Sequence, residues 1–134
     1  MPFDLFKQKN YPTDLQFDAI YPKFYREHSA RHFTPVAIAV KASKLLVDQP
    51  TDKILDIGSG VGKFCCIGSC LTGAHFYGVE KRKALINLAN RIKYRYKLKK
   101  AHFIHNDFTA LDLAGLMEFI SLILSMNIST LPAF

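Results

Sequence analysis

The sequence lacks the features that mark several classes of protein. Only three cysteines are present, Cys65, Cys66 and Cys70, and their crowding into one short segment excludes a disulfide framework. No histidine stands near them at metal-ligand spacing, so we expect small buried thiols and no metal site. No N-terminal signal peptide is recognisable, and polar residues interrupt the apolar C-terminal stretch too often for a membrane span. We therefore expect a cytoplasmic protein that has no membrane partner.

Acidic residues are also in short supply. The chain has 18 basic and 11 acidic residues, a formal net charge of +7, and half of its basic residues lie between Lys81 and Lys100. That segment places Leu85, Leu88 and Ile92 at helical spacing, which predicts a helix with one apolar face. Its basic faces could attract phosphate, so nucleic acid is left open as a partner. We favour a solvated helix face instead, because the loops where a substrate would enter are not the basic ones.

What the sequence does contain is enough for one folded domain. Its 134 residues are 49% hydrophobic and 13% aromatic, which is sufficient to build a core and excludes a disordered chain. The most informative stretch runs from Lys53 to Phe64. A short apolar run around Asp56 predicts a buried parallel strand, and glycines follow at positions 58, 60 and 62 before a predicted helix.

A strand that ends in alternating glycines and turns into a helix typically lines a ligand crevice. We expect backbone N–H groups and the helix N-terminus to face the ligand there, without Cβ atoms in the way. The alternative is a tight turn that binds nothing. A dinucleotide-binding G-x-G-x-x-G motif would need a third glycine at position 63, where Lys63 stands instead.

The pattern D-x-G-x-G-x-G resembles motif I of the class I S-adenosylmethionine-dependent methyltransferases, and the resemblance extends from Lys53 to Phe108. In that family the loop lies under the methionine part of the cofactor. Glu80 follows a predicted strand 24 residues after Asp56, and the resemblance implies that it binds the ribose hydroxyls. The resemblance also implies that Asp107 meets the adenine amine. The implied cofactor-binding residues are Thr34, Asp56, Gly58, Ser59, Gly60, Gly62, Glu80, Asn106, Asp107 and Phe108.

The remaining segments predict alternating helices and strands. Aromatic residues at helical spacing predict short helices within residues 1–33, with a break at Pro22. Thr34 and Pro35 predict the start of a helix that runs to Val47, with Thr34 as its cap and most of its circumference buried. Further helices are predicted at 63–71 and 81–100, and further strands at 75–79, 102–105 and 117–124.

These elements predict an α/β fold, a Rossmann-like parallel sheet with strand order 3-2-1-4 as far as it extends, preceded by N-terminal helices. Residues 1–50 form a helical extension that packs on the sheet, and residues 51–134 form the cofactor-binding half of the domain. The resemblance ends after Gly115, as in a methyltransferase truncated at its C-terminus. One hypothesis is a frameshift, because codons chosen for Leu116 to Asn127 can be read one base earlier as F-D-G-I-Y-F-F-N-P-F-Y-E, a methyltransferase-like strand and motif.

The function implied by the resemblance is methyl transfer from S-adenosylmethionine. The acceptor, which is a protein, a nucleic acid or a small molecule, stays open, as do the catalytic residues and the oligomeric state. Two alternatives also stay open. One is an NAD-type nucleotide-binding domain, which Lys63 disfavours, and the other is a truncated, inactive fragment that binds cofactor weakly.

Overall fold

The structure is a computed structural model that describes residues 2–27, 33–107 and 113–125. Short helices come first, and helices then alternate with three strands. In chain order the elements are α1 (Asp4–Lys7), α2 (Asp14–Asp18), α3 (Lys23–Glu27), α5 (Val36–Leu46), β1 (Lys53–Ile57), α6 (Lys63–Thr72), β2 (His75–Glu80), α7 (Lys83–Tyr96), β3 (Ala101–His105) and α8 (Leu113–Ser125).

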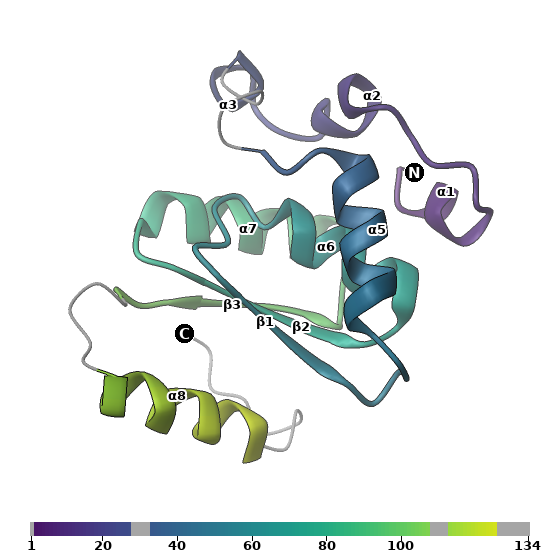
Figure 1. The fold of residues 1–134 in the computed structure, drawn as a ribbon. Coiled ribbons are helices and arrows are strands. Elements are labelled where there is room, and N and C mark those ends of the chain that lie inside the picture. The colour runs from purple at the N-terminus through teal and green to yellow at the C-terminus, as the bar shows by residue number, and fades with distance from the viewer. Residues whose placement is uncertain (1, 28–32, 108–112, 126–134) are drawn as a thin grey trace.

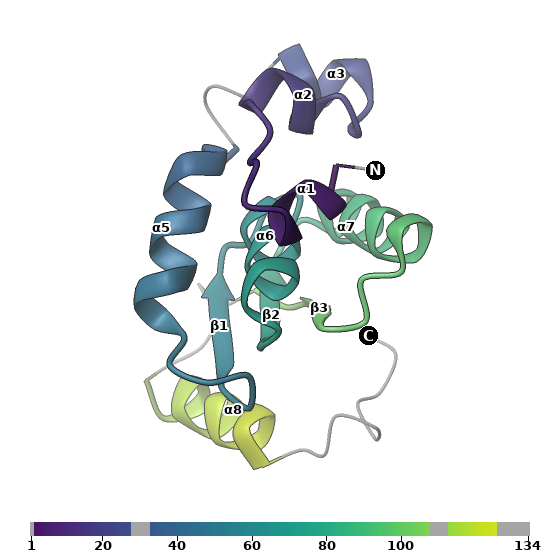
Figure 2. The ribbon, with the colours of Figure 1, turned by 90° about the vertical axis from the view of Figure 1, so that its right-hand side faces the viewer.

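The three strands form a parallel sheet in the order β1-β2-β3. Helices α5, α6 and α7 lie on one side of the sheet and α8 lies on the other (Figure 1). In the view turned by 90°, α8 again lies below the strands, and α2 and α3 lie above α6 and α7 (Figure 2). The α/β class and the 3-2-1 part of the predicted strand order are therefore confirmed. Parallel pairing brings the carboxyl ends of all three strands to one edge of the sheet, where the candidate site lies.

The predicted fourth strand is wrong, because residues 117–124 lie within α8. A short apolar run is compatible with a strand or with a buried helix, and periodicity has to decide between them. Four exposed residues of α8, Glu118, Ser121, Leu122 and Ser125, follow helical spacing. Three of these four are polar, so the helical period was present in the sequence beneath the apolar run.

The predicted burial of the first strand is also only partly correct. β1 is half-buried along most of its length, and Ile57 keeps 49% of its surface exposed. In the described part of the chain, β1 pairs with β2 alone and is therefore an edge strand. An edge strand has no neighbour to cover one of its sides.

Helix α5 departs from its prediction at its start and along its surface. Pro35, and not Thr34, is the N-cap residue of α5, and the N–H of Val36 donates to Asp14 Oδ1 of α2 at 2.7 Å. Only a narrow face of α5 is buried, while Ile38, Leu45 and Leu46 are 55%, 75% and 53% exposed. Apolar character around most of the helix predicted burial over most of its circumference, but the described structure provides packing partners on one side only.

One continuous hydrophobic core, rich in aromatic residues, joins the N-terminal helices to the sheet. Phe17 and Tyr21 are buried, and Phe17 makes an edge-on contact with Phe3 at 5.3 Å between ring centroids. The ring of Tyr21 packs against Phe33 at 4.9 Å. Phe24 lies at helical spacing from Phe17 and Tyr21, which predicts that it shares their buried face, but it is 65% exposed. The predicted break at Pro22 is confirmed, because α2 ends before it and α3 begins after it.

The helices that flank β2 follow their predictions closely. α6 ends at Thr72, and Gly73 follows in the left-handed conformation at φ 74°. α7 is shorter than the predicted range of 81–100, because Lys97 adopts a left-handed conformation at φ 56° and ends the helix. Of the described helices, none combines the length and the apolar character that crossing a membrane requires.

A cluster of histidines lies on the face of the sheet opposite to α6 and α7. His75 and His102 stack with ring centroids 5.2 Å apart, and His75 Nδ1 lies 2.9 Å from His102 Nε2. Tyr77 stacks on His102 from the neighbouring strand, and Lys93 Nζ lies 3.4 Å from His102 Nδ1. Burial, followed by the charges of Lys93 and His75, lowers the pKa of His102 to about 4. His102 is therefore neutral at neutral pH.

Candidate functional site

The glycine loop between β1 and α6 contains two kinds of glycine. All three adopt positive φ, at 80° for Gly58, 58° for Gly60 and 81° for Gly62. A Cβ atom added to Gly58 or Gly60 would meet nothing within 4 Å, whereas one added to Gly62 would lie 2.5 Å from the ring of Phe103. Gly58 and Gly60 therefore border open space that a ligand could occupy, and Gly62 is required for packing against β3.

The N–H groups of this loop are used differently from the expectation. Gly58 and Ser59 both donate to the carbonyl oxygen of Val79, at 2.7 and 3.0 Å. Gly60 donates to Glu80 Oε1 at 3.0 Å, and Gly62 donates to the carbonyl oxygen of Ser59 at 2.9 Å. Three of these donors hold the loop against β2, the fourth closes a turn within the loop, and none of the four is directed at a ligand. The loop offers a ligand close approach at its glycines instead.

The side chain of Ser59 points toward the sheet. A Cβ atom on Gly78 would lie 2.7 Å from both Cβ and Oγ of Ser59, so the loop rests on the strand only because residue 78 is glycine. Sequence reasoning missed this role of Gly78. The signal was available, since a glycine inside a strand often marks the close approach of another backbone.

Four of the predicted site residues meet in one cleft at the carboxyl ends of the strands. Gly58, Glu80, Asn106 and Asp107 come from the ends of three different strands, and the N–H of Asn106 donates to the carbonyl oxygen of Glu80 at 3.1 Å. This convergence agrees with the parallel order of the sheet. The cleft has a volume of about 220 Å³ and is lined by Ile57, Gly58, Val79, Glu80, Lys81, Arg82, Asn106 and Asp107.

Glu80 is an acidic group of the cleft that is firmly held in place. Its side chain is 2% exposed, and its carboxylate accepts hydrogen bonds from Gly60 and from Arg82. Burial alone would raise the pKa of Glu80, but the hydrogen bonds from Arg82 and Gly60 and the charge of Arg82 outweigh it and lower the pKa to about 2. Glu80 is therefore ionised at any physiological pH, and its acceptor positions are taken by Gly60 and Arg82 in this structure.

Asp56 lies beneath the loop and does not line the cleft. Its Oδ2 atom lies 3.9 Å from the thiol sulfur of Cys65 on α6. Burial raises the pKa of Asp56 to about 6; the hydrogen bond from Cys65 opposes this shift, and the negative charge of Glu80 adds to it. The position of Asp56 favours a role in supporting the loop over direct contact with a ligand.

Two further predicted residues are not seen at the cleft, for different reasons. Thr34 precedes α5 and is not among the residues that line this cleft. Phe108 lies outside the described residues. Their assignments as cofactor contacts stay predictions.

A second cavity, of about 210 Å³, adjoins Arg82 on the side away from the cleft. It is open to Gly60 and is walled by three aromatic side chains of the N-terminal segment and by the start of α7. Its lining residues are Phe24, Tyr25, Phe33, Gly60, Val61, Arg82 and Leu85. Because Arg82 lines both cavities, it stands between the cleft at Glu80 and this aromatic cavity.

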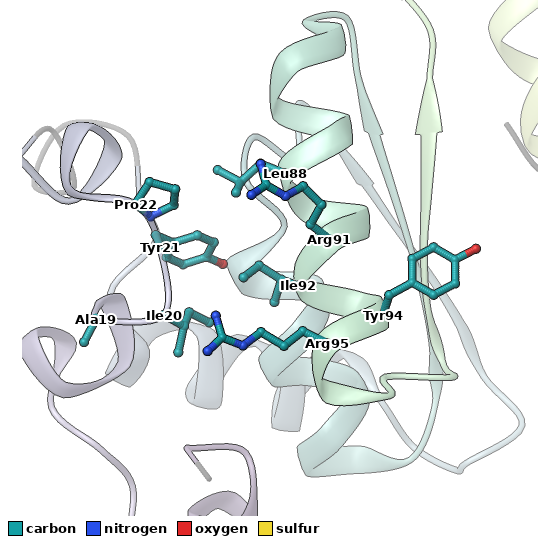
Figure 3. A pocket seen from close by; sticks show the side chains of 9 residues that line it. All are labelled: Ala19, Ile20, Tyr21, Pro22, Leu88, Arg91, Ile92, Tyr94 and Arg95. Carbon is teal, nitrogen blue, oxygen red and sulfur yellow. The ribbon is translucent and has the colours of Figure 1, made fainter.

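A larger cavity of about 570 Å³ lies away from the predicted site residues, between the Ala19–Pro22 segment and α7. The side chains of Arg91 and Arg95 extend from α7 on this side, whereas Tyr94 points away (Figure 3). None of its lining residues belongs to the glycine loop or to the strand ends. Its size alone does not make it the functional site.

Lys63 is the main feature that sequence analysis missed. Its side chain is 2% exposed, and its Nζ atom lies 2.8 Å from Asp14 Oδ1 and 2.8 Å from Asp18 Oδ1. The same Nζ atom lies over the ring of Phe17 at 5.4 Å. Lys63 is the first residue of α6 and directly follows the glycine loop. Its ion pairs therefore connect α2 to the start of α6. Its partners lie more than 40 residues earlier in the chain, so no local pattern could reveal the ion pairs.

The cysteines behave as predicted, as thiols without disulfide partners. Cys65 and Cys66 are buried, Cys70 is partly buried, and burial raises the pKa of all three above the usual range of a thiol. Within residues 2–27, 33–107 and 113–125, no group of three or more His, Cys, Asp or Glu side chains could hold a metal ion.

Comparison with solved structures identifies the fold. No protein-family model and no curated protein sequence matches the chain. Among solved structures, YjhP from E. coli aligns with a TM-score of 0.52 at 24% identity, over 64% of this chain and 37% of that chain. A SAM-dependent methyltransferase from Thiobacillus denitrificans, in complex with S-adenosyl-L-homocysteine, aligns with a TM-score of 0.53 at 19% identity, over 75% of this chain and 50% of that chain.

An RNA methyltransferase from Salinibacter ruber, also in complex with S-adenosyl-L-homocysteine, aligns with a TM-score of 0.54 at 23% identity, over 61% of this chain and 54% of that chain. The chain therefore spans between about a third and about half of the length of these similar structures. As far as its three strands extend, the chain has the Rossmann-like fold of the class I methyltransferases.

Proposed function

We propose that this chain binds S-adenosylmethionine at the carboxyl ends of its strands and that it is the cofactor-binding part of a methyltransferase. The observation that carries the proposal is the convergence of Gly58, Glu80 and Asp107 on one cleft beside the open positions of the glycine loop. The cleft provides a permanently ionised carboxylate for hydroxyl groups and a second carboxylate from the end of β3. A ribose diol and an adenine amine are ligand groups that such carboxylates accept hydrogen bonds from.

The adjoining aromatic cavity is suited to bind the methionine part of the same ligand. It begins at Gly60, where a Cβ atom would meet nothing within 4 Å, and its walls include Tyr25 and Phe33. Aromatic rings attract cations through their negative faces, so a positively charged sulfonium suits this cavity. We place the adenosine part in the cleft and the methionine part toward the aromatic cavity.

Methyl transfer from S-adenosylmethionine mainly requires that the protein position the cofactor and the acceptor. S-adenosylmethionine supplies an electrophilic methyl group, and transfer is a displacement in which proximity and orientation of the acceptor provide much of the acceleration. In this proposal Glu80 and Asp107 fix the nucleoside, and Gly58 and Gly60 allow close approach. The acceptor and any general base stay unassigned.

The proposal is tested by calorimetric titration of the chain with S-adenosylhomocysteine and, separately, with NAD. We expect saturable binding of S-adenosylhomocysteine and none of NAD, because Lys63 stands where a dinucleotide loop needs glycine and its side chain is buried. Gly60→Val should abolish binding, since its side chain would enter the open space at a residue with φ 58°. Binding of NAD alone, or undiminished binding by Gly60→Val, would contradict the proposal.

A further inference from the structure

The carboxylate of Glu80 has no acceptor position left for a ligand in the described structure. Oε1 accepts from the N–H of Gly60 at 3.0 Å and from Arg82 Nη2 at 3.2 Å. Oε2 accepts from the N–H of Arg82 and from Arg82 Nε, both at 2.9 Å. A carboxylate offers about four lone-pair positions, and four donors fill them here.

Two of these four donors differ from the others because they can leave. The backbone donors of Gly60 and Arg82 belong to the loop and to the residue that precedes α7, and they hold Glu80 in place. The guanidinium group of Arg82 sits on a side chain that is 55% exposed, so moving it disturbs no core packing. Withdrawal of the guanidinium would open one position on each carboxylate oxygen.

The guanidinium fork and a ribose share a hydrogen-bonding pattern. Nε–H and Nη2–H reach the two oxygens of Glu80 side by side, as in a bidentate arginine–carboxylate pair. A ribose presents two neighbouring hydroxyl donors that can span the same two oxygens. Arg82 and a ribose diol therefore compete for the same positions.

We propose that Arg82 occupies the ribose position on Glu80 and that a nucleoside ligand binds by displacing it. Arg82 is then a specificity-determining residue that lowers the affinity for every nucleoside and selects those with an intact diol, because only a diol replaces both of the lost hydrogen bonds. This inference rests on the proposed function and adds to it a built-in competitor at the ribose site. The position of Arg82 between the two cavities fits this role, since a ligand that spans both must pass it.

The size of the effect follows from the exposure of the pair. Glu80 is buried, but the side chain of Arg82 is 55% exposed, so a displaced guanidinium regains its hydration and the competing state is favoured only modestly. Removal of the guanidinium should therefore tighten binding about 3- to 10-fold. Lysine can donate to one oxygen at a time and cannot reproduce the fork, so Arg82→Lys should give an intermediate gain.

The test is calorimetric titration of the 134-residue chain and its variants with S-adenosylhomocysteine and with its 2′,3′-dideoxy analogue. Arg82→Ala should bind S-adenosylhomocysteine about 3- to 10-fold more tightly than the unmodified chain. The dideoxy analogue should gain less than S-adenosylhomocysteine from this substitution. Arg91→Ala serves as the matched control, because it removes an equal charge from an exposed position of α7 that lines the larger cavity and neither the cleft nor the aromatic cavity. Thermal unfolding of each variant verifies its fold.

Unchanged or weaker binding of S-adenosylhomocysteine by a folded Arg82→Ala variant would overturn the inference and leave the proposed function standing. An equal gain for the dideoxy analogue would overturn it as well, because the diol would then play no part. A gain of the same size in Arg91→Ala would reduce the effect to net charge and overturn the inference too. Absence of S-adenosylhomocysteine binding by the unmodified chain and by every variant would overturn the proposed function together with this inference.

Discussion

Replacing Lys63 with methionine should destabilise the fold strongly. Methionine retains the apolar stem but removes the ammonium group that lies 2.8 Å from both Asp14 and Asp18. The side chain of Asp18 is only 9% exposed and would be left as an unpaired buried charge. Removing one partner of a buried ion pair typically costs about 3–5 kcal/mol, and we expect a loss of this size in the free energy of unfolding.

The two aspartates contribute unequally to that loss. Asp14 is 51% exposed, so water screens its ion pair, and its share should be at most about 1 kcal/mol. Burial raises the pKa of Asp18, while Lys63 opposes the shift. Without Lys63 the pKa of Asp18 rises further above its value in the unfolded chain. The stability of the variant should then fall as pH rises through this raised pKa, so the loss should be larger at about pH 7.5 than at about pH 5.

Urea unfolding followed by circular dichroism at both pH values measures this loss. Lys41→Met on the exposed surface of α5 is the matched control and should change stability by less than about 0.5 kcal/mol. Combining Lys63→Met with Asp18→Leu removes the unpaired charge and should recover much of the stability. A loss below about 1 kcal/mol for Lys63→Met at about pH 7.5, or a larger loss at acid pH, would refute the reasoning.

Three further predictions concern the cleft, the histidine cluster and the basic helix. Asp107→Ala should keep the fold, checked by circular dichroism, and weaken S-adenosylhomocysteine binding about 10-fold in calorimetry; unchanged affinity would remove Asp107 from the site. The folded-state pKa of His102 is lowered to about 4, so stability should fall by about 2 kcal/mol, allowing for partial exposure, as pH drops from about 6.5 to about 4. His102→Phe should flatten this dependence in urea titrations, and an equally steep curve would contradict the assignment. For the basic segment 81–100, we expect weak RNA binding in filter assays, and strong salt-dependent binding that is lost when Lys93, Arg95, Lys97 and Lys99 become glutamine would contradict that expectation.

The parts of the site that sequence analysis predicted depend on local spacing. Gly58 and Gly60 mark a turn within a few residues, and Glu80 and Asp107 lie at or just after the ends of their strands. Parallel order then brings strand ends together without any need to know individual contacts. The neighbour of Glu80 was equally local, since Arg82 stands two residues away, but its charge was counted only as part of the basic helix.

The parts that were not predicted depend on contacts between distant segments. The cap of α5 comes from Asp14, 22 residues before Val36, where the sequence offered Thr34 close at hand. The burial of Lys63 likewise requires the N-terminal helices to fold back on the glycine loop. The strand predicted at residues 117–124 was wrong for another reason. An apolar run does not distinguish a strand from a helix unless the spacing of its polar residues is also considered.

The central claim, that the strand-end cleft is a binding site for S-adenosylmethionine, is tested most directly by mapping amide chemical shifts of the isotope-labelled chain during titration with S-adenosylhomocysteine. The account predicts saturable shifts at Gly58, Gly60, Arg82 and Asp107, which border the cleft or the aromatic cavity. The amide of Arg91, beside the cavity on the far part of α7, should stay unchanged. Shifts that gather around Arg91 instead, or a spectrum that does not change at saturating ligand, would contradict the account.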